Sequence, residues 1–150
     1  MGRIYTVVEA FLQADGWPCK QLEGQEVAMT SFKGKKGEFN CFVQAREAQE
    51  HLIVYSVLPV LVPEERRDEI AAFLTRANYG MPVGNFEMDF GDGEVRYKTS
   101  VDLEDVDEFQ ILLRNLMYAN VLSMDKYIPG LMGVIYTGAS AAEAIAEIEG

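Results

Sequence analysis

Much of the fold is decided by the stretch Asn85-Phe-Glu-Met-Asp-Phe-Gly-Asp-Gly-Glu-Val-Arg-Tyr-Lys-Thr-Ser-Val101. Apolar and polar residues alternate on both sides of Asp92-Gly93, a dipeptide typical of two-residue β-hairpin loops of type I′. Such a loop predicts the apolar pairs Phe90–Val95, Met88–Tyr97 and Phe86–Thr99, and the charged pairs Asp89–Arg96 and Glu87–Lys98. The hairpin is therefore expected to turn one face to a core and the other to water.

The composition is that of one globular domain. The chain has 150 residues, of which 49% are hydrophobic and 25% are charged. A chain of this length can bury a sizeable core, and this balance argues against disorder. No repeat, linker or shift in composition divides it, so residues 1–150 are expected to form a single domain.

The charge is strongly acidic. Lys and Arg total 13 against 24 Asp and Glu, which gives a formal net charge of −11. This surface repels phosphate backbones and anionic lipids, so neither nucleic acid nor a membrane is an expected partner. No apolar run approaches the roughly 20 residues of a membrane span, and the first residues do not resemble a signal peptide. We expect a cytoplasmic protein in which Cys19 and Cys41 stay reduced.

The rest of the chain predicts helices around a meander of strands. Apolar residues from Ile4 to Leu12 recur at helical spacing, and three strands are expected over 25–33, 38–46 and 51–58. A second helix begins at Pro63 and precedes the hairpin. A third begins at an Asp105 cap with Glu108 as its capping-box partner. The order α-β-β-β-α-β-β-α, with extra helix at the C-terminus, is an α+β pattern with an antiparallel sheet.

Two further signals concern the last helices. Pro129-Gly130 should kink or restart the third helix, because proline removes a backbone donor and clashes with the preceding turn. Ser140 and Glu143 form a second capping box, which predicts a short terminal helix.

The sequence offers little catalytic chemistry. His51 is the only histidine and is expected at a strand end near solvent, and the two cysteines lie too far apart in sequence for a zinc motif. Asp89, Asp92 and Glu94 lack the spacing of a calcium loop. The turn Gly34-Lys-Lys-Gly37 would either contact an anion or be a solvated hairpin tip. We predict no catalytic residue, no metal, no cofactor and no enzyme activity.

The three-strand meander carries the main functional signal. Two-residue loops at Lys35-Lys36 and Ala48-Gln49 leave both faces of the sheet substantially apolar. The second face has six apolar residues: Val27, Met29, Phe42, Ile53, Tyr55 and Val57. A helix of the same chain, a second subunit or a client must cover that face. We expect helix two to add Ile70, Phe73 and Leu74 to this dimer or partner surface, although helix two or the C-terminal segment would otherwise cover the face within one monomer.

Two segments resemble the YbjN family, whose members are often labelled bacterial sensory transduction regulators. They are Phe73-Leu-Thr-Arg-Ala-Asn-Tyr-Gly80 and Gly84-Asn-Phe-Glu-Met-Asp-Phe-Gly-Asp-Gly-Glu-Val-Arg-Tyr-Lys98. Tyr127-Ile-Pro-Gly130 also looks like the family's late helix segment. The family is similar in fold to the small acidic chaperones of type III secretion, which form homodimers, largely through their second helix, and bind extended client segments.

The resemblance implies a fold and a mode of binding, and it carries over no catalytic residue. The leading hypothesis is a non-enzymatic, chaperone-like or regulatory homodimer that binds a protein client. The alternative is a small-molecule-sensing regulatory domain with a pocket between the sheet and the C-terminal helix.

Overall fold

The computed structural model describes all 150 residues and has the expected α+β architecture. Six antiparallel strands form one sheet in the order β1-β2-β3-β4-β6-β5. The strands are β1 (Cys19–Gln21), β2 (Val27–Lys33), β3 (Glu38–Arg46), β4 (His51–Val57), β5 (Asn85–Met88) and β6 (Val95–Asp102). The helices are α1 (Arg3–Ala14), α2 (Arg67–Asn78), α3 (Gln110–Tyr136) and α4 (Ala141–Glu149), with a 3-10 turn, η1, at Glu64–Arg66.

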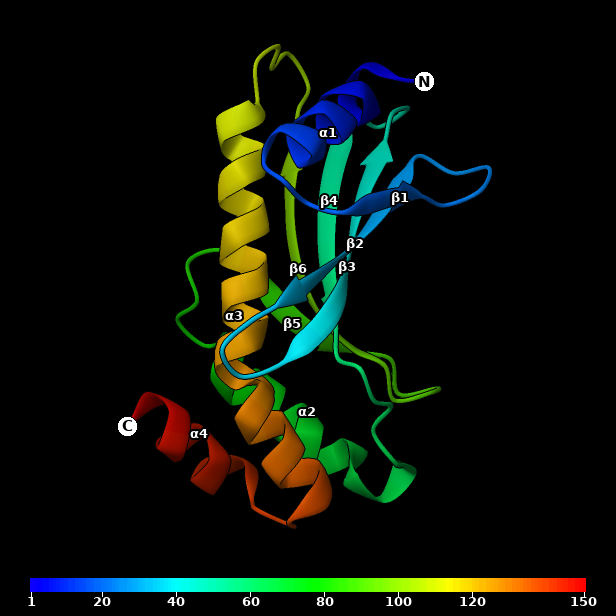
Figure 1. The fold of residues 1–150 in the computed structure, drawn as a ribbon. Helices are drawn as coiled ribbons and strands as arrows, with labels where there is room; N and C mark the ends of the chain where they lie inside the picture. The colour runs from blue at the N-terminus through cyan, green and yellow to red at the C-terminus, as the bar shows by residue number, and fades with distance from the viewer.

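The helices gather on one side and at one end of the sheet. Figure 1 shows α3 running along the sheet, with α1 beside its upper part and α2 and α4 packed around its lower end. The main core lies between the sheet and these helices, and its largest fully buried side chains include Tyr5, Phe73, Tyr97 and Phe109. The fold therefore has a helical layer on one face of the sheet only.

The meander has the predicted register. Lys33 faces Glu38 and Arg46 faces His51, so the loops are the two-residue segments Lys35-Lys36 and Ala48-Gln49. β3 has the predicted bounds, and the chain adds only the short strand β1, which has too few residues to give a readable pattern.

The β5–β6 hairpin corrects the predicted register. Phe86 faces Tyr97 and Met88 faces Val95, so the register is displaced by two residues and the loop is longer than two. The Asp89 N–H donates to the Glu94 carbonyl at 2.9 Å, which leaves Phe90 in the loop, more than half exposed. A displacement of two keeps every side chain on its predicted face. Glu87 now lies opposite Arg96 instead of Lys98.

Contacts from outside the hairpin explain the wider loop. The Val62 N–H donates to the Gly93 carbonyl at 2.9 Å, and the Arg67 guanidinium donates to the carbonyls of Val62 and Phe90, each at 3.0 Å. Gly93 has a φ of +84°. A Cβ there would lie 2.2 Å from the Val62 carbonyl oxygen, so only glycine fits this contact.

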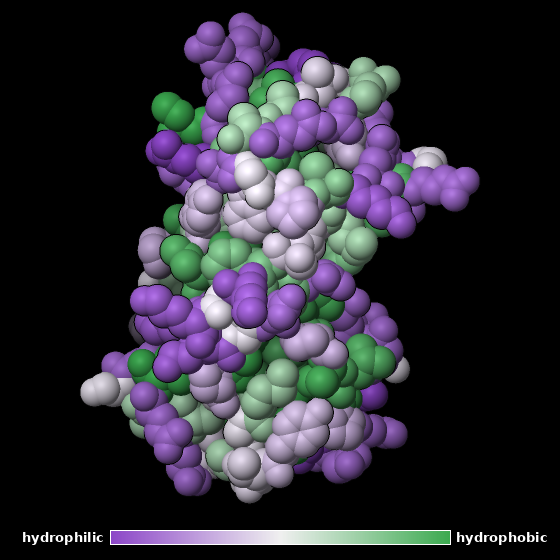
Figure 2. All heavy atoms as spheres, in the orientation of Figure 1, coloured by the Kyte–Doolittle hydropathy of each residue, from purple (hydrophilic) through white to green (hydrophobic).

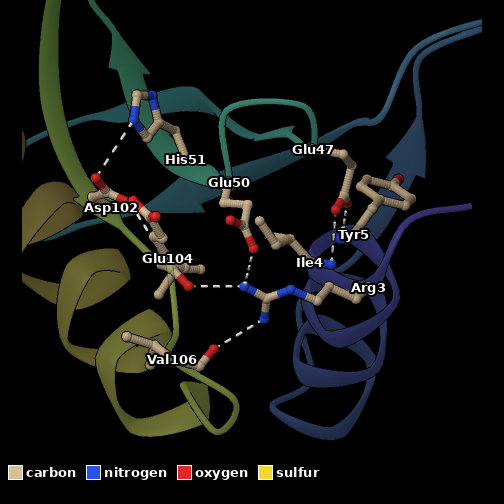
Figure 3. A network of polar contacts seen from close by, with 10 residues as sticks. Arg3, Ile4, Tyr5, Glu47, Glu50, His51, Asp102, Glu104 and Val106 are labelled. Carbon is tan, nitrogen blue, oxygen red and sulfur yellow. Dashed lines mark hydrogen bonds and ion pairs between the residues drawn. The ribbon is translucent and has the colours of Figure 1, made fainter.

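The start of α3 also differs from the prediction. Asp105 has a φ of +61° and caps nothing; the N-cap residue is Phe109. The Arg3 guanidinium explains this, because it donates to the carbonyls of Leu103 and Val106 at 2.8 and 2.9 Å and so holds the preceding loop. Figure 3 shows Arg3 also reaching Glu50, while Glu47 accepts the N–H groups of the first turn of α1. These contacts join α1, the β3–β4 turn and the loop before α3.

The remaining helix signals have mixed outcomes. α3 does not restart at Pro129; it is one helix through that residue, and Figure 1 shows its later, orange part leaning toward α2. At the start of α4 the Ser140 hydroxyl accepts the Glu143 N–H at 3.1 Å, as the capping box predicts.

Candidate functional site

The two faces of the sheet have different surroundings. The inner face carries Cys41, Val43, Leu52 and Val54, which are fully buried under the helices. The opposite side, the outer face, carries the six apolar residues expected from the sequence: Val27, Met29, Phe42, Ile53, Tyr55 and Val57. None of the six belongs to the main core cluster or packs against it. No helix of the chain therefore covers the outer face.

Strand register brings these six residues together. Met29, Phe42 and Tyr55 lie side by side in one row across β2, β3 and β4. Val27 and Ile53 flank Gln44 in the row on one side, and Val57 lies beside Asn40 in the row on the other. Side chains in facing positions of adjacent strands contact one another, so the outer face has a continuous apolar centre.

Connected hollows mark this face. One of about 360 Å³ and another of about 220 Å³ share Phe42, Val57 and Glu94 in their walls. A third, of about 380 Å³, lies toward the other end of the strands and shares Tyr55 with the second. The surface is therefore indented along the direction of the strands rather than flat.

Charge is distributed unevenly between the outer face and the rest of the chain. Register places five of the 13 Lys and Arg residues on this face, and only three of the 24 Asp and Glu residues. The basic ones are Lys20, Lys33, Arg46, Arg96 and Lys98, and the acidic ones are Glu38, Glu87 and Asp102. Glu94, in the walls of two of the hollows, adds a fourth carboxylate. The outer face is thus nearly neutral on a protein whose other surfaces are strongly acidic.

Arg96 links the apolar centre to the charged margin. Its guanidinium lies 4.1 Å from the centroid of the Tyr55 ring, and its Nε lies 2.5 Å from Glu87 Oε1. Lys98 Nζ is 3.3 Å from the other Glu87 oxygen. Burial alone would raise the pKa of the Glu87 carboxyl, but hydrogen bonds and positive charge from Arg96 and Lys98 outweigh it and lower that pKa.

Helix two does not contribute to this surface. Ile70 and Phe73 are fully buried and Leu74 is nearly so, all within the main core. The Phe73 ring meets Tyr127 of α3 edge to face, with centroids 6.2 Å apart. α2 lies between β5 and α4, a placement that its own apolar stripe could not reveal. The expected surface therefore reduces to its six strand residues.

Sequence reasoning missed a second uncovered surface. Ile111, Asn115, Tyr118 and Leu122 are exposed at spacings of three or four residues along α3, and we call them the α3 stripe. The Tyr118 hydroxyl donates to Asp15 Oδ2 at 2.7 Å, a hydrogen bond that raises the Tyr118 pKa. The helical spacing of these residues is visible in the sequence. Because α3 has apolar residues on all sides, the sequence does not show which of its apolar residues face outward.

The two edges of the sheet are also unequal. The Asn78 side chain, from α2, accepts the Phe86 N–H at 2.7 Å and donates to the Phe86 carbonyl at 3.0 Å. It thereby occupies the hydrogen-bonding groups that β5 turns outward at Phe86. The other edge is formed by β1, which has three residues.

Buried polar groups between the sheet and α3 form a satisfied cluster. The Asn120 amide donates to the carbonyls of Val54 and Tyr97 at 2.9 and 3.1 Å, and its oxygen accepts the Ser56 hydroxyl. No buried side-chain nitrogen or oxygen lacks a partner. Five hollows in the surface, among them the three on the outer face, lie outside this layer, and no α3 residue lines them.

The Gly34–Gly37 turn does contact an anion, and that anion belongs to the chain itself. Asp125 of α3 accepts the N–H groups of Lys35, Lys36 and Gly37 at 3.1, 2.9 and 3.0 Å. A Cβ on Gly34 would lie 2.2 Å from an Asp125 oxygen, which explains the glycine. The carboxylate fixes the tip of the meander on α3.

The residues weighed for chemistry remain apart. His51 lies at a strand end, half exposed, with Nε2 4.0 Å from Asp102. Cys19 and Cys41 both face Thr30, on either side of β2, so about 10 Å of sheet separates them. Burial raises the pKa of the Cys41 thiol to about 12. No group of three or more His, Cys, Asp or Glu side chains is placed to hold a metal ion. No helix, α3 included, has the length and apolarity to cross a membrane.

The fold belongs to a class, that of the type III secretion chaperone-like α+β folds. A chain of the HopA1–SchA chaperone–effector complex is similar at a TM-score of 0.52 and 15% identity, covering 83% of this chain and 91% of that one. The crystal structure of YbjN from E. coli is similar at a TM-score of 0.54 and 12% identity, covering 79% and 85%.

The chain belongs to the YbjN family, described as "Putative bacterial sensory transduction regulator", whose model matches residues 5–116. No curated protein sequence matches the chain.

Proposed function

We propose that this protein is a non-enzymatic, chaperone-like or regulatory module of the cytoplasm, which acts as a homodimer and binds an extended segment of another protein on its outer face. The observation that carries the proposal is the continuous apolar centre of that face, which no helix covers. Val27 and Ile53 are buried by their neighbours on the sheet, and Met29, Phe42, Tyr55 and Val57 are partly exposed. An apolar surface of this kind that no helix covers is typical of protein-binding sites.

The shape of the outer face supports an extended ligand. The connected hollows lie along the strands, where Val57 and Tyr55 line successive ones. Alternate residues of an extended chain are about 7 Å apart and point the same way, so every second side chain of a bound segment would enter the surface. Similarity in fold to a chain of a chaperone–effector complex supports a protein partner.

Charge supports a particular kind of segment. The margin of the outer face carries Lys20, Lys33, Arg46 and Lys98, while the rest of the protein repels anions. A segment that alternates apolar residues with Asp or Glu would bury the former in the hollows and place the latter beside these cations. A basic segment would be drawn instead to the acidic surfaces elsewhere.

The alternative, a small-molecule sensor, has less support. Its pocket was expected between the sheet and the C-terminal helix, where the Asn120 cluster occupies the space. The larger hollows are open and lie elsewhere, whereas small-molecule sites bury most of their ligand.

The test is a peptide-binding measurement with matched variants. Fluorescence anisotropy would compare extended peptides that alternate Leu or Val with Asp against the same peptides with Lys in place of Asp. We expect tighter binding of the Asp series, weakened by salt, and a loss of at least about tenfold in affinity for Val57→Glu. Leu122→Glu, on the α3 stripe, is the control and should keep the affinity.

Two results would contradict the proposal. Equal affinity for the Asp and Lys peptides would contradict the charge argument. Unchanged affinity of the Val57→Glu variant would show that the outer face is not the binding site. Mass spectrometry of material that co-purifies from native lysate tests the alternative, a small-molecule sensor. A stoichiometric small molecule retained by wild type and by Val57→Glu would favour the sensor.

A further inference from the structure

α3 has an outward side that the rest of the chain contacts only at Tyr118, through Asp15 and Trp17. The exposed fractions of Ile111, Leu122 and Tyr118 are 65%, 56% and 37%. Eleven residues separate Ile111 from Leu122, a length of about 16 Å along the helix. Leu112, beside this stripe, is 41% exposed. Figure 2 shows hydrophobic surface about midway along α3, with hydrophilic atoms at the loop above it. A helix that is apolar on its outward side as well as its inward side is usually packed on both.

The charges near the stripe are separated by sign. The one acidic residue of α3 is Asp125, which is buried against the Gly34–Gly37 turn. The exposed charged residues of the helix are Arg114 and Lys126. The loop before the helix is acidic, with Glu104, Asp105, Asp107 and Glu108. Although Arg114 lies near that end of the surface, the end is negative, and the other end carries Lys126.

We propose that the α3 stripe is the homodimer interface, with the α3 helices of two copies packed antiparallel about a two-fold axis near Met117. Antiparallel packing places the acidic loop of each copy beside Lys126 of the other. Counted along the sequence, Glu108 and Lys126 are equally far from Met117, and so are Leu112 and Leu122. Met117 itself faces the core and marks only the level of the axis, so one register brings both the charges and the leucines to matching levels. A surface with this property is complementary to itself, as a two-fold interface requires.

The charge of the protein indicates where a second copy of the chain can bind. Two copies that each carry a net charge of −11 repel one another over most of their surfaces. The stripe itself carries no acidic residue, and the one carboxylate against it, Asp15, accepts hydrogen bonds from Tyr118 and Trp17. Contact there therefore brings few like charges together. α3 lies on the opposite side of the sheet from the outer face, so this dimer leaves both outer faces free. The inference rests on the homodimer of the proposed function and specifies its interface.

Sedimentation equilibrium of the full chain at tens of micromolar tests the interface. We expect a dimer for wild type and for Val57→Glu, and a monomer for Leu122→Glu, whose dissociation constant should rise at least about 100-fold. Leu122 is mostly exposed, so the melting temperature of the Leu122→Glu monomer should match that of diluted wild type. A dimer that survives Leu122→Glu overturns the inference.

Charge reversal tests the antiparallel register. Lys126→Glu should weaken the dimer by about tenfold, and adding Glu108→Lys to the same chain should restore it. Failure of the double variant to recover would overturn this register. A wild-type monomer would overturn both the inference and the proposed homodimer. A dimer broken by Val57→Glu and kept by Leu122→Glu would leave the homodimer standing and place it on the outer face instead.

Discussion

The inner and outer faces of the sheet have similar apolar residues, but helices cover only the inner face. The inner face tolerates polar groups such as Ser56 and Thr99, because Asn120 and the backbone of α3 give each of them a partner. The outer face has six apolar residues in contact across three strands and no helix over them. Packing inside one chain therefore explains the inner face fully, and it leaves the outer face to be explained by an interaction.

The largest expected effect separates the core from the surface. Phe73→Ala should lower the free energy of unfolding by about 3–5 kcal/mol, because it opens a cavity against Tyr127 and Gly130. Tyr79→Ala, just beyond the end of α2 and 92% exposed, should change it by less than about 0.5 kcal/mol. Denaturant unfolding measures both. A soluble, stable Phe73→Ala monomer would indicate that α2 is part of the dimer interface after all.

The polar cluster of the inner face should come next. Asn120→Ala removes the partner of the Val54 and Tyr97 carbonyls and of the Ser56 hydroxyl, and should cost about 2–3 kcal/mol. Chemical denaturation at neutral pH gives the value. Gln110→Ala, exposed in the first turn of the same helix and outside the α3 stripe, is the control and should be nearly neutral. Equal losses for the two would show that the cluster contributes little.

Glycine substitutions extend the comparison to the turns. Gly93 and Gly16 have similar positive φ values of +84° and +79°, but only Gly93 has neighbours that a Cβ would meet. Gly16→Ala should cost about 1–2 kcal/mol from backbone strain alone, and Gly93→Ala should cost more. Thermal unfolding of both variants isolates the contact with Val62. Identical melting temperatures would contradict the wider β5–β6 loop.

The smallest effect belongs to the outer face and depends on pH. The pKa of Glu87 is lower in the folded protein than the value of about 4.3 for an unfolded chain. Its stabilisation is therefore present above that value and is lost as the pH falls through the folded pKa. Glu87→Gln should cost no more than about 1 kcal/mol at pH 7, since the group is partly exposed, and nothing well below pH 4. A constant difference between pH 3 and 7 would contradict the shift.

The sequence predicted the fold class, the meander register and the six strand residues of the outer face, because short loops and alternation are local signals. It failed where distant segments decide. Contacts from Val62 and Arg67 hold a wider loop in place of the predicted two-residue turn at Asp92-Gly93. Hydrogen bonds from Arg3 hold the loop before α3, so Asp105 does not cap the helix. The burial of α2 depends on α4, and the cations of the outer face depend on β6 pairing with β4 instead of β5 alone. Neither arrangement leaves a pattern within its own segment.

Asn78 has a consequence for how sheets of different molecules can join. Head-to-tail growth of a fibre needs two receptive edges on every molecule, one to give and one to take. Because the Asn78 amide bonds the backbone groups of Phe86 that a neighbouring strand would use, a strand of another molecule can pair with little of the β5 edge. Only the β1 edge stays receptive, so edge pairing between copies stops at two. A single amide side chain thus disfavours open-ended polymerisation through the edges of this sheet.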